Sequence, residues 1–343
     1  MLRNSRVDGW KGFIFLTSCF FILLAFAAST VAQEMKAIEE GAKKEGKLNL
    51  YGSMREDEAT AAFQVFNKKY PAVKIDYFRG SETKLLGRIL TEAKAGAHNL
   101  DLLITTGGIQ LKDLKMGLNW TPPSASGFIP ELKDPDGIVH PIYINTNVIQ
   151  YNTKLVAKAD APKTYADLAN PKWKGKLCLE DSDHEWFEGM MKYMGKEKSL
   201  ALFKRIAANQ PAVRNGHGLL SDLVASGECP IAINNYGNQV ARAQQKGAPT
   251  DWVAIEPVVT IIAPGVVSNK APHPDAAKLY LNWITSKEGQ ETIAKKGRIP
   301  VRVDVNANPP RLTKGLKLHV VYALHGKNQK TIKDLYKQVW EGR

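Results

Sequence analysis

The chain has 343 residues, 44% of them hydrophobic and 24% charged, and a formal net charge of +13 at pH 7. This length exceeds that of a usual single domain, so two lobes are expected. The positive charge is compatible with a nucleic acid or another anionic partner. The lysines are scattered over helix-like runs without the interleaved aromatic residues of a nucleic-acid groove, and we therefore expect no nucleic-acid partner.

Residues 1–32 have the pattern of a secretory signal peptide. Arg3, Arg6 and Lys11 precede an apolar run over residues 12–28, and small residues lead to Ala32. We expect cleavage after Ala32 and export, with residues 33–343 remaining. The alternative is an uncleaved membrane anchor, because the apolar run approaches the length of about 20 residues that spans a bilayer.

Three strand-like stretches in the first third of the chain end in glycine or hydroxyl residues, and two of them lead directly into a helix-like run. Such strand ends meet at one edge of an open α/β sheet, where ligands bind. The unpaired backbone N–H groups at the start of a helix favour a negative group there. The candidate ligand-binding residues at these three ends are Ser53, Ser81, Thr105 and Thr106.

The middle of the chain repeats this plan after a long alternating stretch over residues 137–152. We interpret residues 143–147 as the first crossing between two lobes and residues 258–267 as the second. Lobe 1 is expected over residues 33–144, lobe 2 over 145–260, and a return to lobe 1 over 261–343, which leaves open whether the last helix packs on lobe 2. The candidate ligand residues from lobe 2 are Asp183, Glu185, Trp186, His217, Asn235 and Tyr236.

Two facing sets of loops around a doubly crossed hinge predict an α/β fold with a ligand cleft that closes on a small molecule. Several lobe 2 candidates keep a second interpretation. Asp183 and Glu185 could bind an ammonium group or simply start a helix, and a calcium loop is disfavoured because Trp186 occupies the place of its turn glycine. Trp186 could equally pack in the core, and His217 could face solvent.

Cys178 and Cys229 lie in strand-like runs of the exported part of the chain. Export makes a disulfide chemically possible, and two buried thiols are the alternative. Neither cysteine lies in a reactive environment, because a thiolate inside an apolar strand would be costly. The sequence also lacks a GxSxG nucleophile elbow, so we expect a binding protein; an enzyme on the same scaffold is the alternative from another class.

The sequence resembles a known family, the solute-binding components of bacterial ABC importers. Within this family it is most similar to the ferric-iron-type branch of the type II periplasmic binding fold. The resemblance covers nearly all of the exported chain. It implies a two-lobed type II fold, a location in the periplasm, and a permease in the inner membrane as partner. One cleft per chain needs no partner subunit, so we expect a monomer, and we expect no cofactor. The stretches that carry it are LNLYGSMREDEATAAF, ITTGG, NVIQYNTKLV, APKTYADLANPKWKGKL, LVASGECPIAINNYGNQVARAQQKGAP and APGVVSNKAPHPDAAKLYLNWITSKEGQETIAKKGRIPVR.

The resemblance also implies how a ferric ion would be held: by paired tyrosines after the INN strand, a histidine in the first loop and often an acidic residue in the third. This sequence keeps Tyr236 but has Gly237 beside it, and Arg55 stands where the histidine would fall. One phenolate is a poor cage for a hard trivalent ion. Ferric ion, with Tyr236 as a metal ligand, is therefore the alternative.

Arg55 instead offers a planar fork suited to carboxylate or phosphate oxygens. We expect an anionic or zwitterionic solute, such as an organophosphonate, a phosphorylated sugar or a carboxylate. The alternative for Arg55 is an exposed arginine that pairs with Glu56 or Asp57 of its own helix.

Overall fold

The computed structural model describes residues 29–321 and 327–342 of the chain. Its strands are β1 (Lys47–Gly52), β2 (Lys74–Arg79), β3 (Leu102–Ile104), β4 (His140–Asn152), β5 (Leu177–Glu180), β6 (Ala212–Arg214), β7 (Ile231–Tyr236), β8 (Thr250–Val253), β9 (Val258–Val267) and β10 (Leu318–Val321). Its longer helices are α2 (Glu56–Lys69), α3 (Glu82–Lys94), α4 (Ile109–Asp113), α5 (His184–Met194), α6 (Lys196–Ala207), α7 (His217–Ser226), α8 (Gly237–Gln245), α9 (Pro274–Ile284), α10 (Lys287–Lys295) and α11 (Lys327–Trp340).

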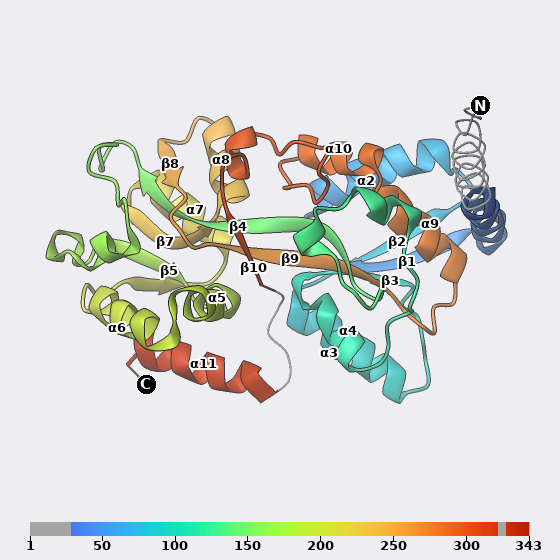
Figure 1. Ribbon diagram of the computed structural model, residues 1–343, viewed down its shortest axis with the longest axis horizontal. Helices are drawn as coiled ribbons and strands as arrows, with labels where there is room; N and C mark the ends of the chain where they lie inside the picture. The colour runs from blue at the N-terminus through green and yellow to red at the C-terminus, as the bar shows by residue number, and fades with distance from the viewer. Residues whose placement is uncertain (1–28, 322–326, 343) are drawn as a thin grey trace, which may run out of the picture.

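The strands form one continuous set in the order β2-β1-β3-β9-β4-β7-β5-β6, with β10 beside β9 and β8 beside β4. Strands β1, β2 and β3 are mutually parallel and belong to lobe 1, whereas β5, β6 and β7 are parallel and belong to lobe 2. The long strands β4 and β9 pair antiparallel and run through both lobes (Figure 1). They are the two crossings of the hinge.

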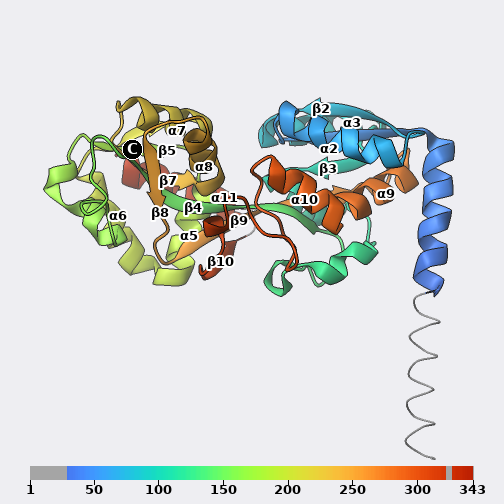
Figure 2. The same cartoon turned by 90° about the horizontal axis from the view of Figure 1, so that it is seen from above.

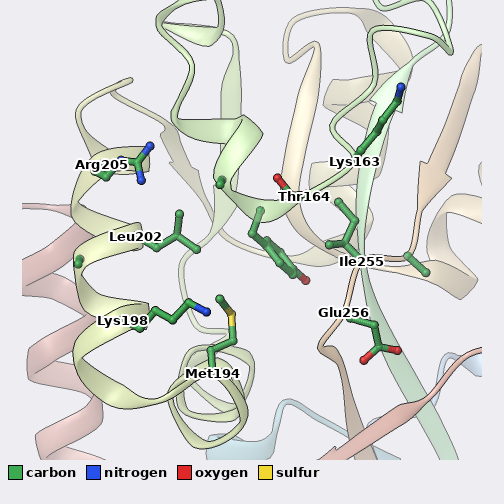
Figure 3. A pocket seen from close by; sticks show the side chains of 12 residues that line it. Lys163, Thr164, Met194, Lys198, Leu202, Arg205, Ile255 and Glu256 are labelled. Carbon is green, nitrogen blue, oxygen red and sulfur yellow. The ribbon is translucent and has the colours of Figure 1, made fainter.

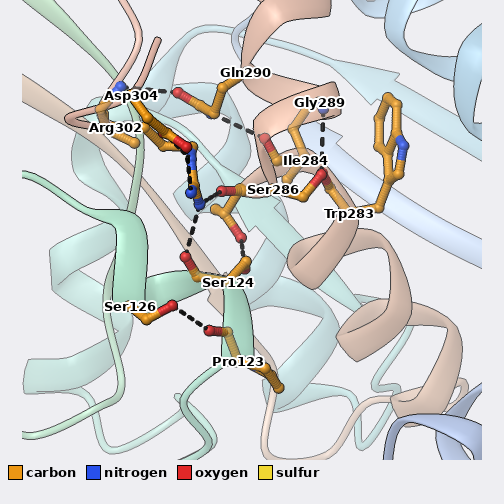
Figure 4. Close-up of polar contacts among 12 residues, drawn as sticks. Pro123, Ser124, Ser126, Trp283, Ile284, Ser286, Gly289, Gln290, Arg302 and Asp304 are labelled. Carbon is orange, nitrogen blue, oxygen red and sulfur yellow. Dashed lines mark hydrogen bonds and ion pairs between the residues drawn. The ribbon is translucent and has the colours of Figure 1, made fainter. Parts of the chain in front are cut away.

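The segment that follows the second crossing is attached to lobe 1 by hydrogen bonds. Arg302 Nη1 donates hydrogen bonds to the carbonyl oxygens of Ser124 at 2.9 Å and Thr285 at 3.2 Å, and the hydroxyls of Ser124 and Thr285 lie 2.6 Å apart. The side-chain oxygen of Gln290 accepts from the backbone N–H of Val301 at 2.8 Å (Figure 4). These bonds satisfy buried backbone groups and fix residues 298–304 against α9 and α10.

Lobe 2 has an aromatic core that the C-terminal helix completes. Phe187 and Phe203 stack with ring centroids 4.8 Å apart, and Tyr336 of α11 meets Phe187 edge-on at 5.2 Å. Helix α11 packs against α5 and α6, so the chain ends on lobe 2 (Figure 1). A disulfide joins Cys178 of β5 to Cys229, which directly precedes Pro230 and β7. Of the two possibilities that the sequence left open, a disulfide or two buried thiols, the structure has the disulfide.

Residues 29–45 form a helix at the edge of lobe 1 (Figure 2). Ile38 and Ala42 of this helix are buried in the lobe 1 core, and Trp120 Nε1 donates to Glu34 at 2.9 Å. The apolar run of the predicted signal peptide lies outside the described residues, whereas Ala32, the predicted cleavage point, lies in this helix. Within the described ranges no helix combines the length and apolar character needed to cross a membrane.

Candidate functional site

A cleft of about 680 Å³ lies between the lobes, at the strand ends. Lobe 1 contributes the loops after β1, β2 and β3, and lobe 2 contributes the loops after β5, β6 and β7. Ser81 is the N-cap residue of α3, and its hydroxyl oxygen accepts a hydrogen bond from the Lys84 N–H at 3.4 Å. The lining residues are Ser53, Ser81, Glu82, Thr83, Thr106, Glu180, Ser182, Asp183, His184, Glu185, Asn215, Gly216, His217, Tyr236 and Lys333.

The structure brings most of the sequence candidates together in this cleft. From lobe 1 these are Ser53, Ser81 and Thr106; from lobe 2 they are Asp183, Glu185, His217 and Tyr236. The other candidates, Arg55, Thr105, Trp186 and Asn235, are not among the residues that line it.

Arg55 turns away from the cleft toward its own helix. Its Nε lies 3.1 Å from Asp57 Oδ1, and its side chain is 46% exposed. Glu56, Asp57 and Glu58 occupy the first turn of α2, where carboxylates complement the helix dipole and attract the preceding arginine. In this structure Arg55 therefore has the alternative arrangement, an arginine paired within its own helix.

Trp186 and Thr105 are both fully buried. The ring of Trp186 packs against Phe203, with centroids 5.4 Å apart, on the core side of α5. This is the core alternative that the sequence left open for Trp186.

Asn235 lies behind the cleft wall and orients two residues that do line it. Its Oδ1 lies 3.2 Å from His217 Nδ1 and accepts from the Tyr236 N–H at 2.8 Å. The rings of His217 and Tyr236 stack with centroids 3.5 Å apart. Burial lowers the pKa of His217 to about 3, so the imidazole is neutral. With Nδ1–H donated to Asn235, Nε2 is left as a hydrogen-bond acceptor.

Asp183 is as buried as Glu180, with 2% of its surface exposed, but it has fewer hydrogen-bond donors around it. Its Oδ2 accepts from Asn234 Nδ2 at 3.2 Å, and within the described part of the chain its buried Oδ1 has no hydrogen-bond partner. Burial, together with the nearby charges of Glu180 and Glu185, raises the pKa of Asp183 well above its usual range. The backbone N–H of Trp186 opposes this rise and lowers the pKa of Asp183. A buried carboxylate oxygen that lacks a donor is costly, so a solute group that supplies one would stabilise it.

Acidic residues dominate the charge of the cleft. Glu82, Glu180, Asp183 and Glu185 line it, and Lys333 is the one lysine or arginine among the described lining residues. Burial raises the pKa of Glu82 and Glu180 as well. Glu180 accepts backbone hydrogen bonds from Ser182 at 2.7 Å and Gly216 at 2.9 Å, which hold the lobe 2 loops together.

Several lining residues were not among the sequence candidates. Glu82 and Thr83 follow the predicted Ser81, and Glu180 and Ser182 precede the predicted Asp183, so the strand-end rule could have included them. Lys333 could not be found in this way, because it comes from α11 and enters the cleft only through the packing of that helix on lobe 2. In the described residues no three His, Cys, Asp or Glu side chains form a group that could hold a metal ion.

A second cavity of about 680 Å³ lies within lobe 2. Lys198, Leu202 and Arg205 of α6 line one side of it, and Ile255 and Glu256 lie opposite (Figure 3). Its lining residues all fall between positions 163 and 256, so lobe 1 contributes nothing to it. Of these two cavities, the interlobe cleft is therefore the one whose shape changes when the lobes close.

A two-lobed α/β fold with a polar cleft between the lobes defines a protein that captures a small solute. The sequence profile of the bacterial extracellular solute-binding protein family matches residues 61–316. The chain belongs to this family.

Curated relatives match along most of their length. Iron uptake protein A1 of Synechocystis sp. is 25% identical over 287 residues, which are 76% of this chain and 78% of that protein. The Fe(3+)-binding periplasmic protein of Serratia marcescens is 21% identical over 298 residues, which are 83% and 84% of the two chains.

Solved structures share the fold. Iron-bound HitA from Pseudomonas aeruginosa has a TM-score of 0.71 at 20% identity, covering 85% of this chain and 99% of its own. The protein AfuA from Actinobacillus pleuropneumoniae with bound fructose-6-phosphate has a TM-score of 0.69 at 22% identity, covering 87% and 97%.

These findings confirm the predicted two-lobed periplasmic binding fold, the resemblance to the iron-type branch and the role of solute-binding component of an ABC importer. The relatives are substrate-binding transport proteins of the periplasm. Absence of enzymatic activity, a monomeric state and cleavage of the signal peptide remain predictions.

Proposed function

We propose that this protein captures a zwitterionic solute in the interlobe cleft and that the positive group of the solute binds the lobe 2 wall. The observation that carries the proposal is Asp183 Oδ1, a buried carboxylate oxygen without a donor among the described residues. Glu185 lines the same wall, and the neutral His217 ring adds an acceptor nitrogen. A group with N–H donors or a positive charge suits such a wall.

The lobe 1 wall supports a polar or anionic end of the same solute. Ser53, Ser81 and Thr83 supply hydroxyls, and Lys333 of α11 adds a positive charge from the lobe 2 side. Glu82 lines the same wall, and burial, which raises the pKa of its carboxyl, disfavours its charged form. This assignment narrows the sequence expectation of an anionic or zwitterionic solute, because Arg55, on which a purely anionic solute would have depended, lies outside the lining.

Ferric iron is the second candidate. The relatives named for iron support it, and the cleft offers more anionic oxygen donors than the sequence indicated, since Glu82 and Glu180 line it together with the predicted Asp183, Glu185 and Tyr236. Lobe closure would have to bring Glu82 of lobe 1 to the donors of lobe 2, because the acidic side chains do not form a metal-binding group in this arrangement. In either case, we expect the closed form to deliver its solute to a membrane permease.

Native mass spectrometry of protein recovered from the periplasm tests both candidates, because it reports the mass of the retained solute. We expect a solute with a cationic group, and its retention should be lost in Asp183→Asn. Iron with a visible phenolate-to-metal absorption band that disappears in Tyr236→Phe would establish the second candidate. A retained anion without any positive group would contradict both.

A further inference from the structure

Two helices that follow loops of the cleft meet across the lobes. Helix α2 begins shortly after Ser53 in lobe 1, and α8 begins directly after Tyr236 in lobe 2. Glu58 of α2 forms an ion pair with Arg242 of α8. Arg242 Nη2 also donates to the carbonyl oxygen of Lys296, which follows α10, at 3.4 Å. Figure 2 shows α8 opposite α10.

This contact is buried. The side chain of Glu58 is 1% exposed and that of Arg242 is 14% exposed. A second arginine, Arg298 of lobe 1, places Nε and Nη2 each 2.7 Å from Glu58 Oε2, and its guanidinium lies 4.2 Å from the ring centroid of Tyr143 in β4. Charges in such a place are tolerated only when they are paired.

The two arginines differ in what happens when the lobes separate. Arg298 belongs to the same lobe as Glu58, so the carboxylate keeps a buried partner in any arrangement of the lobes. Arg242 belongs to the other lobe, and its contact exists only when α2 and α8 are close. Helix α8 also packs through Val240 and Ala241 against a buried apolar cluster that includes Ile144 of β4 and Ile262 of β9.

We propose that Glu58 and Arg242 are positioning residues of the solute site: their ion pair holds the lobes at a set angle before the solute arrives. The pair links the helices that follow Ser53 and Tyr236, so it also sets the separation of these two cleft residues. A solute then meets lobes that start from one defined angle, and less of its binding free energy is spent on restricting their motion. The inference holds for any solute and does not depend on its charge.

The test measures the distance between lobes in solute-free protein. Spin labels at Leu90→Cys in α3 and Leu219→Cys in α7 report it by double electron–electron resonance; both positions are exposed, and the native Cys178 and Cys229 are bridged. The full chain carries Cys19→Ser so that the two introduced cysteines alone are labelled. We expect Arg242→Met to broaden the distance distribution and shift it away from that of the parent protein, and Arg242→Lys to restore it in part.

Arg311→Met is the matched control. Arg311 pairs with Asp251 of β8 and lies 3.3 Å from the ring centroid of Trp252, so its loss removes an arginine contact that does not involve α2. It should leave the distance distribution unchanged. The proposal is overturned if Arg242→Met, folded as judged by circular dichroism, gives the distribution of the parent protein, or if Arg311→Met shifts it equally.

Discussion

Asp183 combines two properties that oppose each other in a folded protein. Its position beside the cleft suits a ligand with a positive group, while its burial disfavours the charged form of its own carboxyl. The neighbouring Asn234 offers a donor to one oxygen only. The residue therefore lowers the stability of the empty protein and gains a partner when the solute binds.

Replacement of Asp183 by Asn should separate these two effects. The amide keeps the size of the side chain and can still accept from Asn234, but it carries no charge. We expect affinity for the natural solute to fall roughly 10- to 100-fold, as for a lost charge-assisted hydrogen bond, and the melting temperature of the empty protein at neutral pH to rise. Calorimetric titration and thermal unfolding measure the two; lower stability together with unchanged affinity would contradict the assignment.

The raised pKa of Asp183 also predicts a pH dependence with a definite sign. The pKa of Asp183 is higher in the folded protein than in the unfolded chain, so the folded protein binds the carboxyl proton more tightly. Proton binding by Asp183 therefore stabilises the fold fully below the unfolded-state pKa, and this stabilisation is lost as pH rises through the folded-state pKa. Binding of a cationic group should strengthen over the same rise in pH, since it needs the carboxylate. Titrations across the acidic to neutral range check this, with Asp183→Asn expected to flatten both profiles.

Arg55 supports the opposite kind of prediction. Its guanidinium is half exposed and paired with Asp57, and exposed pairs of this kind contribute little, about 0–1 kcal/mol. Arg55→Ala should therefore leave solute affinity within about twofold of the parent protein by the same measure. A loss of tenfold or more in calorimetric titration would return Arg55 to the site in the solute-bound form.

At the scale of elements, lobe 2 depends on contacts between segments that are distant in sequence. The disulfide closes a separation of 51 residues and joins β5 to the residue before Pro230, at the start of β7, two strands that pair in parallel. Helix α11 adds Tyr336, Val339 and Trp340 to the same lobe. The cleft loops after β5 and β7 thus extend from a cross-linked pair of strands.

Loss of the disulfide should destabilise the protein without removing the site. For a loop of this length the chain-entropy model gives about 4 kcal/mol. We expect the Cys178→Ala, Cys229→Ala double variant to melt at a lower temperature and to be insensitive to a reducing agent, whereas the same agent lowers the melting temperature of the parent protein. A parent protein unaffected by reduction would indicate that the thiols are not bridged.

For the whole molecule, the function depends on relative motion of two lobes connected by β4 and β9. A solute held between the lobes contacts both walls only when they approach, so binding and closure are coupled. Clusters of buried apolar side chains fill each lobe, and motion is therefore expected at the crossings.

Saturation with the natural solute should make the molecule more compact and more stable. At a solute concentration 100 times the dissociation constant the gain is about 2.7 kcal/mol. Small-angle scattering should show a smaller radius of gyration, and thermal unfolding a higher melting temperature. The Asp183→Asn variant at the same solute concentration serves as the control, and equal responses from both proteins would argue against solute binding at this wall.

Local sequence patterns were sufficient to predict where strands end and which hydroxyl and acidic residues follow them, because periodicity and turn residues act over a few positions. Ser53, Ser81, Thr106 and Tyr236 were found in this way. Patterns were insufficient where two local interpretations were both physically reasonable. Trp186 could have faced the cleft or the core, and only the packing of α5 on Phe203 decides between them.

The sequence by itself determined the fold class and the two crossings, since these depend on the order of apolar strands and on stretches shared with a family. Tertiary structure alone decided the charge of the cleft. Glu82 and Lys333 contribute to one site although 251 positions separate them, and the acid pKa values depend on burial and on through-space distances that chain order does not contain.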